Sequence, residues 1–120
     1  MSVKVLHSSL ASVTAAAAVA LIVAGGWATY RRTASSIRLV LLIRRVTIIA
    51  AVLAGALGAL LFVAGHRPSA GLHLMYGFFA LVTVPLAATM AARNPARGGL
   101  YHLLAGVLLL GICFRLAGTG

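Results

Sequence analysis

The stretch from Leu10 to Tyr30 reads LASVTAAAAVALIVAGGWATY and ends directly before Arg31 and Arg32. A helix needs about 20 mostly apolar residues to cross a bilayer, and this stretch provides them without a charged side chain. Three further apolar stretches follow, over residues 46–65, 71–92 and 100–117. Backbone polar groups in hydrocarbon must be bonded within their own segment, which favours helices. The sequence therefore predicts an all-α protein in which residues 1–120 form one integral membrane domain, a four-transmembrane-helix up-down-up-down bundle joined by short loops.

The composition supports this prediction and removes several mechanisms. The chain is 62% hydrophobic and 8% charged, against roughly 25% charged residues in a typical soluble domain. All ten charged residues are lysine or arginine, and neither aspartate nor glutamate occurs. General acid–base catalysis by a carboxylate, ion coupling through an acidic side chain and an oxygen-rich calcium site are therefore excluded.

The basic residues predict the orientation in the membrane. Seven of them are expected on one side, namely Arg31, Arg32, Arg38, Arg44, Arg45, Arg93 and Arg97. The other side has Lys4, Arg67 and Arg115. Because cytoplasmic loops are enriched in arginine and lysine, we expect a multi-pass protein of the bacterial cytoplasmic (inner) membrane with both termini outside. Anionic lipid headgroups, rather than nucleic acid, are the expected partners of this charge.

Two connections carry specific expectations. Residues 31–45 are expected to link the first two helices as a basic loop. Between the second and third helices, Pro68 predicts a tight turn and Ser69 an N-cap for the third helix.

Small residues predict which helix faces turn inward, because close helix packing in lipid relies on them. At the angular spacing of a helix, four stripes can be traced. They comprise His7, Ala11, Thr14, Ala18 and Gly25; Ala51, Gly55, Gly58 and Phe62; His73, Gly77, Ala80, Val84 and Ala87; and His102, Gly106 and Cys113.

His7 and His73 are the strongest candidate site. They are expected at similar depth on the first and third helices, which lie diagonally across an up-down bundle. Two facing imidazoles are the axial ligands that a b-type haem requires, and helix bundles build cofactor sites from facing side chains. Ala11 and Gly77, one turn deeper, would leave room for the macrocycle. The sequence therefore predicts haem b bound between His7 and His73.

Three further residues are candidates for the edge of this haem site. Arg67 and Arg115 could neutralise the haem propionates by charge-assisted hydrogen bonds, and Tyr76 could support a propionate. For Arg115 an equally good interpretation is a side chain that reaches the membrane surface as an anchor. Each histidine taken alone is also explained by a ring that lies near an interface and contacts water or headgroups.

A metal site is the alternative use of the same residues. His7, His66 and His73 could supply three nitrogen ligands to copper or zinc. Neither a carboxylate nor a thiolate is at hand to complete such a site, so water or substrate would be the fourth ligand. His102 is expected near the opposite end without a histidine partner, which limits the chain to one haem.

The segment Arg67–Gly77, RPSAGLHLMYG, together with His7, Arg115 and Thr119-Gly120, resembles the layout of small four-helix membrane proteins of bacteria. That resemblance implies no particular activity. In architecture the chain is similar to the di-histidine haem bundles of the cytochrome b561 type, but it lacks their second histidine pair. The resemblance to the cytochromes is at the level of fold only.

These observations lead to two functional hypotheses. The first is a haem-binding electron-transfer protein, expected as a subunit of a larger respiratory or photosynthetic membrane complex. The alternative is a structural accessory subunit of such a complex without a cofactor, in which the arginines pair with carboxylates of a larger partner. Both describe an electron-transfer or accessory protein rather than an enzyme.

Overall fold

The computed structural model describes every residue of the chain except Met1 and Ala70. The described residues are all-helical, as predicted, and include no β-strand. Along the chain the elements are α1 (Val3–Arg31), α2 (Ala34–Val63), α3 (Leu72–Arg93), the 3-10 helix η1 (Pro95–Arg97) and α4 (Gly98–Thr119). Four helices, the last counted with η1, are long and apolar enough to cross a membrane.

The first connection is much shorter than the predicted basic loop over residues 31–45. Only Arg32 and Thr33 separate α1 from α2. Arg32 ends α1 in the left-handed conformation, with φ of 52°, and its N–H donates to the Ala28 carbonyl. Thr33 and Ser36 then form a reciprocal capping box that starts α2. The prediction of a loop was wrong because arginine is a good helix former, so Arg38 and its neighbours continue the helix.

The connection between α2 and α3 also differs from the prediction. Gly65, at φ of +90°, turns the chain after α2 in a conformation that suits glycine. Ser69 does not cap α3, which begins at Leu72 without a side-chain cap. Its hydroxyl instead donates to the carbonyl oxygens of Thr119 and Gly120, each at 3.1 Å. The loop is thereby fastened to the end of α4, and a local helix cap is replaced by a tertiary contact.

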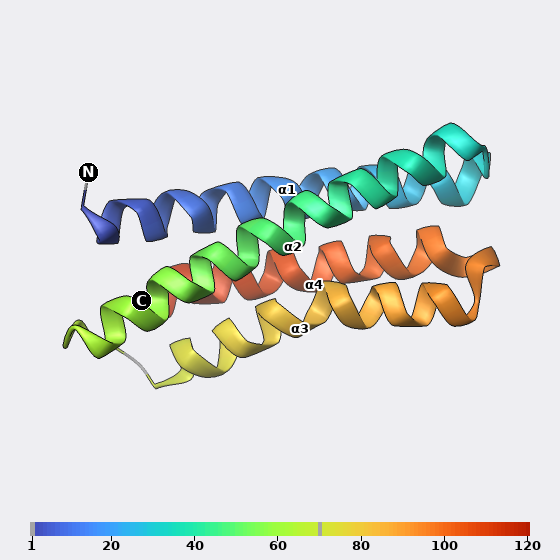
Figure 1. Ribbon diagram of the computed structural model, residues 1–120. Helices are drawn as coiled ribbons and strands as arrows, with labels where there is room; N and C mark the ends of the chain where they lie inside the picture. The colour runs from blue at the N-terminus through green and yellow to red at the C-terminus, as the bar shows by residue number, and fades with distance from the viewer. Residues whose placement is uncertain (1, 70) are drawn as a thin grey trace.

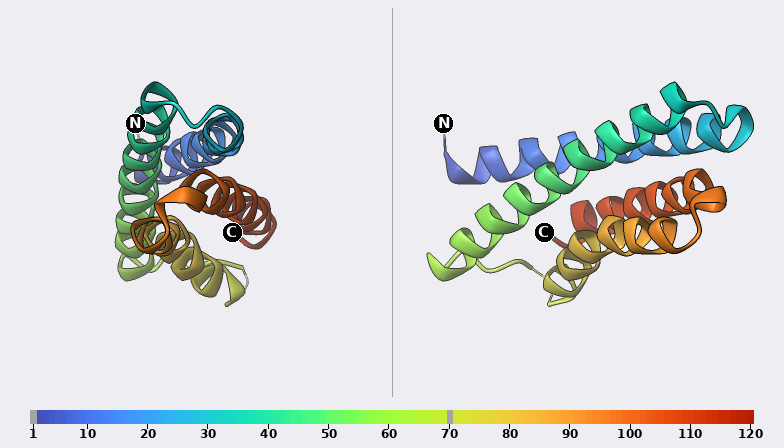
Figure 2. Two further views of the ribbon diagram at one scale, coloured as in Figure 1. Left: turned by 90° about the vertical axis from the view of Figure 1, so that its right-hand side faces the viewer. Right: turned by 45° about the vertical axis from the view of Figure 1, so that its right-hand side comes forward.

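The helices pack in a definite pattern. α1 lies against both α2 and α4, and α4 lies against α3, whereas α2 contacts α3 less extensively. Figure 1 shows the N-terminal and C-terminal ends at one end of the bundle and the connection between α1 and α2 at the other. Figure 2 shows α2 crossing the other helices obliquely. The start of α1, the end of α4 and the α2–α3 loop therefore lie at one end of the bundle. The end of α1 and the start of α4 lie at the other end.

Glycines let the backbones of α1 and α4 approach closely. A Cβ added at Gly25 would lie 2.7 Å from the carbonyl oxygen of Gly99 and from the amide nitrogen of Leu103. One at Gly106 would lie 2.9 Å from the Ala18 carbonyl oxygen. Close backbone approach through small residues is the usual way in which helices associate in lipid.

The core follows the predicted small-residue stripes with one exception. Leu21 of α1 and Leu109 of α4 are fully buried at the centre. The stripe residues that are buried are Thr14, Ala18, Gly25, Ala51, Ala80, Val84, Ala87, His102 and Gly106. The exception is Phe62, which is 38% exposed and lies under the guanidinium of Arg67, 5.7 Å from its ring centroid. It therefore sits at the bundle's edge, where a cation–π contact replaces helix packing.

Candidate functional site

His7 and His73 come together at the end of the bundle that holds both chain termini. Their ring centroids are 6.4 Å apart, and the ring planes are inclined by 57°. His7 lies one turn into α1, and His73 is the second residue of α3, so the two rings come from helices that are separated in the chain by the whole of α2. Both side chains are half-buried. The structure thus places the two predicted ligands side by side.

A backbone contact fixes the orientation of the His7 ring. Its Nδ1 lies 2.8 Å from the carbonyl oxygen of Ala54 in α2. A carbonyl can only accept, so Nδ1 carries the proton and donates, and Nε2 of the neutral ring keeps a free lone pair. Gly58, one turn further along α2, makes space for this ring, since a Cβ there would lie 3.0 Å from His7 Cε1.

His73 is oriented in a similar way by the end of α4. Its Nδ1 lies 3.3 Å from the hydroxyl oxygen of Thr119. That hydroxyl donates its own proton to the Arg115 carbonyl, 3.0 Å away, so it accepts from Nδ1. The lone pair of the neutral His73 ring is therefore also on Nε2. Hydrogen bonds of this kind to the second ring nitrogen are typical of metal-binding histidines, whose tautomer they fix.

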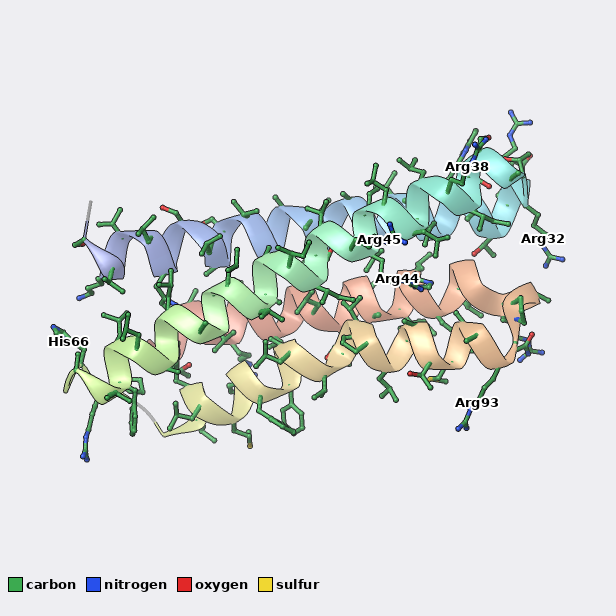
Figure 3. The ribbon with its side chains drawn as sticks, in the orientation of Figure 1. Arg32, Arg38, Arg44, Arg45, His66 and Arg93 are labelled. Atoms are coloured by element: carbon green, nitrogen blue, oxygen red, sulfur yellow. The ribbon has the colours of Figure 1, made fainter. Side chains whose placement is uncertain are left out.

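The other predicted site residues are positioned less closely. Tyr76 is half-buried and packs against the core. Arg67 and Arg115 are exposed, and Arg67 lies over Phe62. His66 is exposed at the end of the bundle opposite Arg32 and Arg93 (Figure 3).

The alternative three-histidine metal site is not assembled. Among the residues that the structure describes, no three histidine, cysteine or acidic side chains come close enough to hold one ion. The physical reason lies in the loop, because His66 precedes the turn at Pro68 and projects from it into the surroundings, while His73 faces the bundle from α3.

The histidine pair has the donor set and spacing that a bis-imidazole metal centre requires. Two imidazoles on opposite sides of one metal ion have ring centroids about 6 Å apart, since each metal–nitrogen bond is about 2 Å long. The observed 6.4 Å agrees with that separation. Among the described residues, nothing lies within 4 Å of a Cβ built at Gly77, so the face of α3 one turn deeper than His73 is open at that position. The two imidazoles are therefore spaced as two ligands of one metal ion would be, and Arg67 and Arg115 lie at the same end of the bundle.

A second polar site, which the sequence did not predict, lies at the opposite end. His102 is 2% exposed, and its Nδ1 lies 2.6 Å from the Gly98 carbonyl oxygen. Its Nε2 is buried and has no hydrogen-bond partner among the described residues. Arg44 of α2 lines the same pocket, of about 340 Å³. The spacing of Arg44, Thr47 and Ala51 along one helix face was the signal that could have revealed it.

No known family matches the chain, and it shows no significant similarity to any curated protein or solved structure in the comparisons.

Proposed function

We propose that the protein binds one b-type haem between His7 and His73 and transfers electrons within a membrane. The observation that carries the proposal is the juxtaposition of the two rings at 6.4 Å, each with Nδ1 held by an acceptor and Nε2 free. The haem, when bound, supplies a one-electron oxidation and reduction. His7 and His73 hold and orient it, while Arg67, Arg115 and Tyr76 bind its propionates.

The membrane setting of this proposal is an up-down-up-down bundle in the bacterial inner membrane, with both termini outside. Four long apolar helices and the arginine distribution support it. In that orientation the histidine pair lies near the outer surface and the arginine-rich end near the cytoplasm. The haem would then exchange electrons with partners at the outer leaflet.

The electron-transfer protein is proposed as a subunit of a larger respiratory or photosynthetic complex. The chain has ten basic side chains and no carboxylate side chain to pair with them. The exposed arginines Arg31, Arg32, Arg38 and Arg45 lie in the half of the bundle away from the histidine pair. Carboxylates of a larger subunit, together with lipid headgroups, are suitable partners for them. The same observation supports the second candidate function, an accessory subunit that binds no cofactor.

A reduced-minus-oxidised absorption spectrum distinguishes the two functions. Protein expressed with a haem supply and purified in detergent should show the sharp α-band of a b-type cytochrome. His73→Ala and His7→Ala should each abolish the low-spin spectrum, because one axial ligand is lost. His66→Ala is the matched control, since it removes an exposed histidine at the same end. A flat spectrum from folded wild-type protein, or an unchanged one in His73→Ala, would refute the haem site and favour the accessory subunit.

A further inference from the structure

The pocket at the arginine-rich end contains a cationic side chain without an acidic partner in the sequence, and a lone pair without a hydrogen-bond partner among the described residues. Arg44 lies ten residues after the start of α2, roughly 15 Å along the helix axis, and is half-buried. Figure 3 shows its side chain extending from α2 toward α4, whereas Arg38 points away from the bundle. The full sequence has no acidic side chain that could neutralise it. A partly buried arginine inside a membrane segment faces a polar partner as a rule.

His102 supplies the second polar group of the same pocket. The His102 ring, from α4, lines this pocket together with Arg44 from α2. Its Nδ1 must carry the proton, because the Gly98 carbonyl at 2.6 Å can only accept. The neutral ring therefore offers Nε2 as an acceptor, and that atom is buried without a partner among the described residues. A buried acceptor without a hydrogen bond is destabilising, so a donor from outside the chain would stabilise the site.

The pocket has the size and the walls for a small headgroup. Its volume of about 340 Å³ corresponds to roughly ten waters in the bulk liquid. Small residues of α3 and α4, among them Ala88, Ala91 and Gly98, line the pocket together with the apolar side chains of Ile37, Val40 and Leu41 of α2. These apolar walls leave Arg44 and His102 as the side chains that can recognise a polar ligand.

We propose that Arg44 and His102 bind the phosphate group of a ligand that also carries a hydroxyl group. The anionic oxygens accept from the Arg44 guanidinium, and the hydroxyl donates to His102 Nε2. Hydrogen phosphate and the glycerol-phosphate headgroup of phosphatidylglycerol share this chemistry. The site lies at the other end of the bundle from the histidine pair, and it does not depend on haem binding.

Calorimetric titration of the delipidated protein in a neutral detergent tests the proposal. The titrants are short-chain phosphatidylglycerol, short-chain phosphatidylcholine and sodium phosphate. Phosphatidylglycerol binding without phosphate binding identifies a lipid headgroup as the ligand, and phosphate binding identifies the free ion. Phosphatidylcholine, which has no hydroxyl and no net charge, should bind at least tenfold more weakly than the preferred ligand. Absence of binding by both phosphatidylglycerol and phosphate, or equal binding of phosphatidylcholine, would overturn the proposal.

Variants assign the binding to this pocket. Arg44→Gln should weaken binding by about ten- to a hundredfold, the usual effect of losing a hydrogen bond to a charged group. Arg45→Gln, which makes the same change at the exposed neighbouring residue, should leave it unchanged. His102→Asn keeps a donor for the Gly98 carbonyl but removes Nε2, and should also weaken binding. If Arg44→Gln does not fold, Arg44→Lys retains the charge and tests the loss of the bidentate fork. Equal affinities of Arg45→Gln and the folded pocket variants would refute the assignment.

Discussion

Replacing Gly25 by alanine tests the close packing of α1 on α4. The new Cβ would lie 2.7 Å from the Gly99 carbonyl oxygen and the Leu103 amide nitrogen, and 3.1 Å from Leu103 Cα. Nonbonded carbon atoms are comfortable at about 3.5–4 Å, so α4 has to move away by roughly 1 Å. All three atoms belong to the backbone and cannot rotate aside. Overpacking of this kind costs about 1–3 kcal/mol of the free energy of unfolding.

Gly26→Ala is the matched control. The nearest atom to its new Cβ is Leu103 Cδ1 at 3.4 Å, the end of a flexible side chain. Both substitutions gain the same intrinsic helix preference of alanine over glycine, about 1 kcal/mol. The difference between the two variants therefore isolates the contact with α4. We expect Gly26→Ala to be as stable as the wild type or more stable, and Gly25→Ala to be less stable than Gly26→Ala by about 1–3 kcal/mol.

The measurement is reversible unfolding in mixed micelles with increasing sodium dodecyl sulfate. Helical circular dichroism and the fluorescence of Trp27, the only tryptophan, provide two probes of the transition. Coincident transitions would justify a two-state treatment of the free energies. Equal stability of the two variants would show that the backbones of α1 and α4 are not in close contact at Gly25, and would refute this packing.

Two further predictions concern the core and the orientation. Leu109→Ala, at a fully buried position, should lower the free energy of unfolding by about 2–5 kcal/mol, whereas Leu108→Ala, 58% exposed, should change it by less than about 1 kcal/mol in the same titration. Equal losses would place both side chains in the same environment. In a Cys113→Ala background, Ser35→Cys in intact bacteria should resist a membrane-impermeant thiol reagent, and Ser2→Cys should react with it; the opposite pattern would invert the proposed orientation.

Sequence patterns located the helices better than they located the helix ends. The four apolar stretches were sufficient to predict four helices, because length and apolar composition are local properties. The start of α2 was missed because Arg38, Arg44 and Arg45 suggested a loop, although Thr33 and Ser36 form a capping box within the same stretch. Ser69 looked like a helix cap, and only the tertiary fold brings the carbonyls of residues 119 and 120 within its reach.

Part of the histidine site was also predictable, because it depends on local sequence patterns. The small-residue stripes turn His7 and His73 inward, and their similar depth follows from residue counting along two helices. The partners of their Nδ1 atoms, on α2 and α4, depend on how the helices pack and could not be read from either stripe. Arg44 was assigned to a loop, so the pocket that it lines together with His102 was not predicted.

The difference in helix length limits the thickness of the bilayer that suits the protein. α1 and α2 have 29 and 30 residues and α3 and α4 have 22 each, which corresponds to roughly 44 Å and 33 Å. A hydrocarbon layer of about 30 Å matches the shorter pair, whereas the longer pair either extends beyond it or tilts within it. A thicker layer would bring charged residues near the helix ends, such as Arg38, into hydrocarbon, at an energetic cost that rises with depth. Hydrophobic mismatch should therefore exclude the protein from thick membrane regions and favour bilayers of average or smaller thickness.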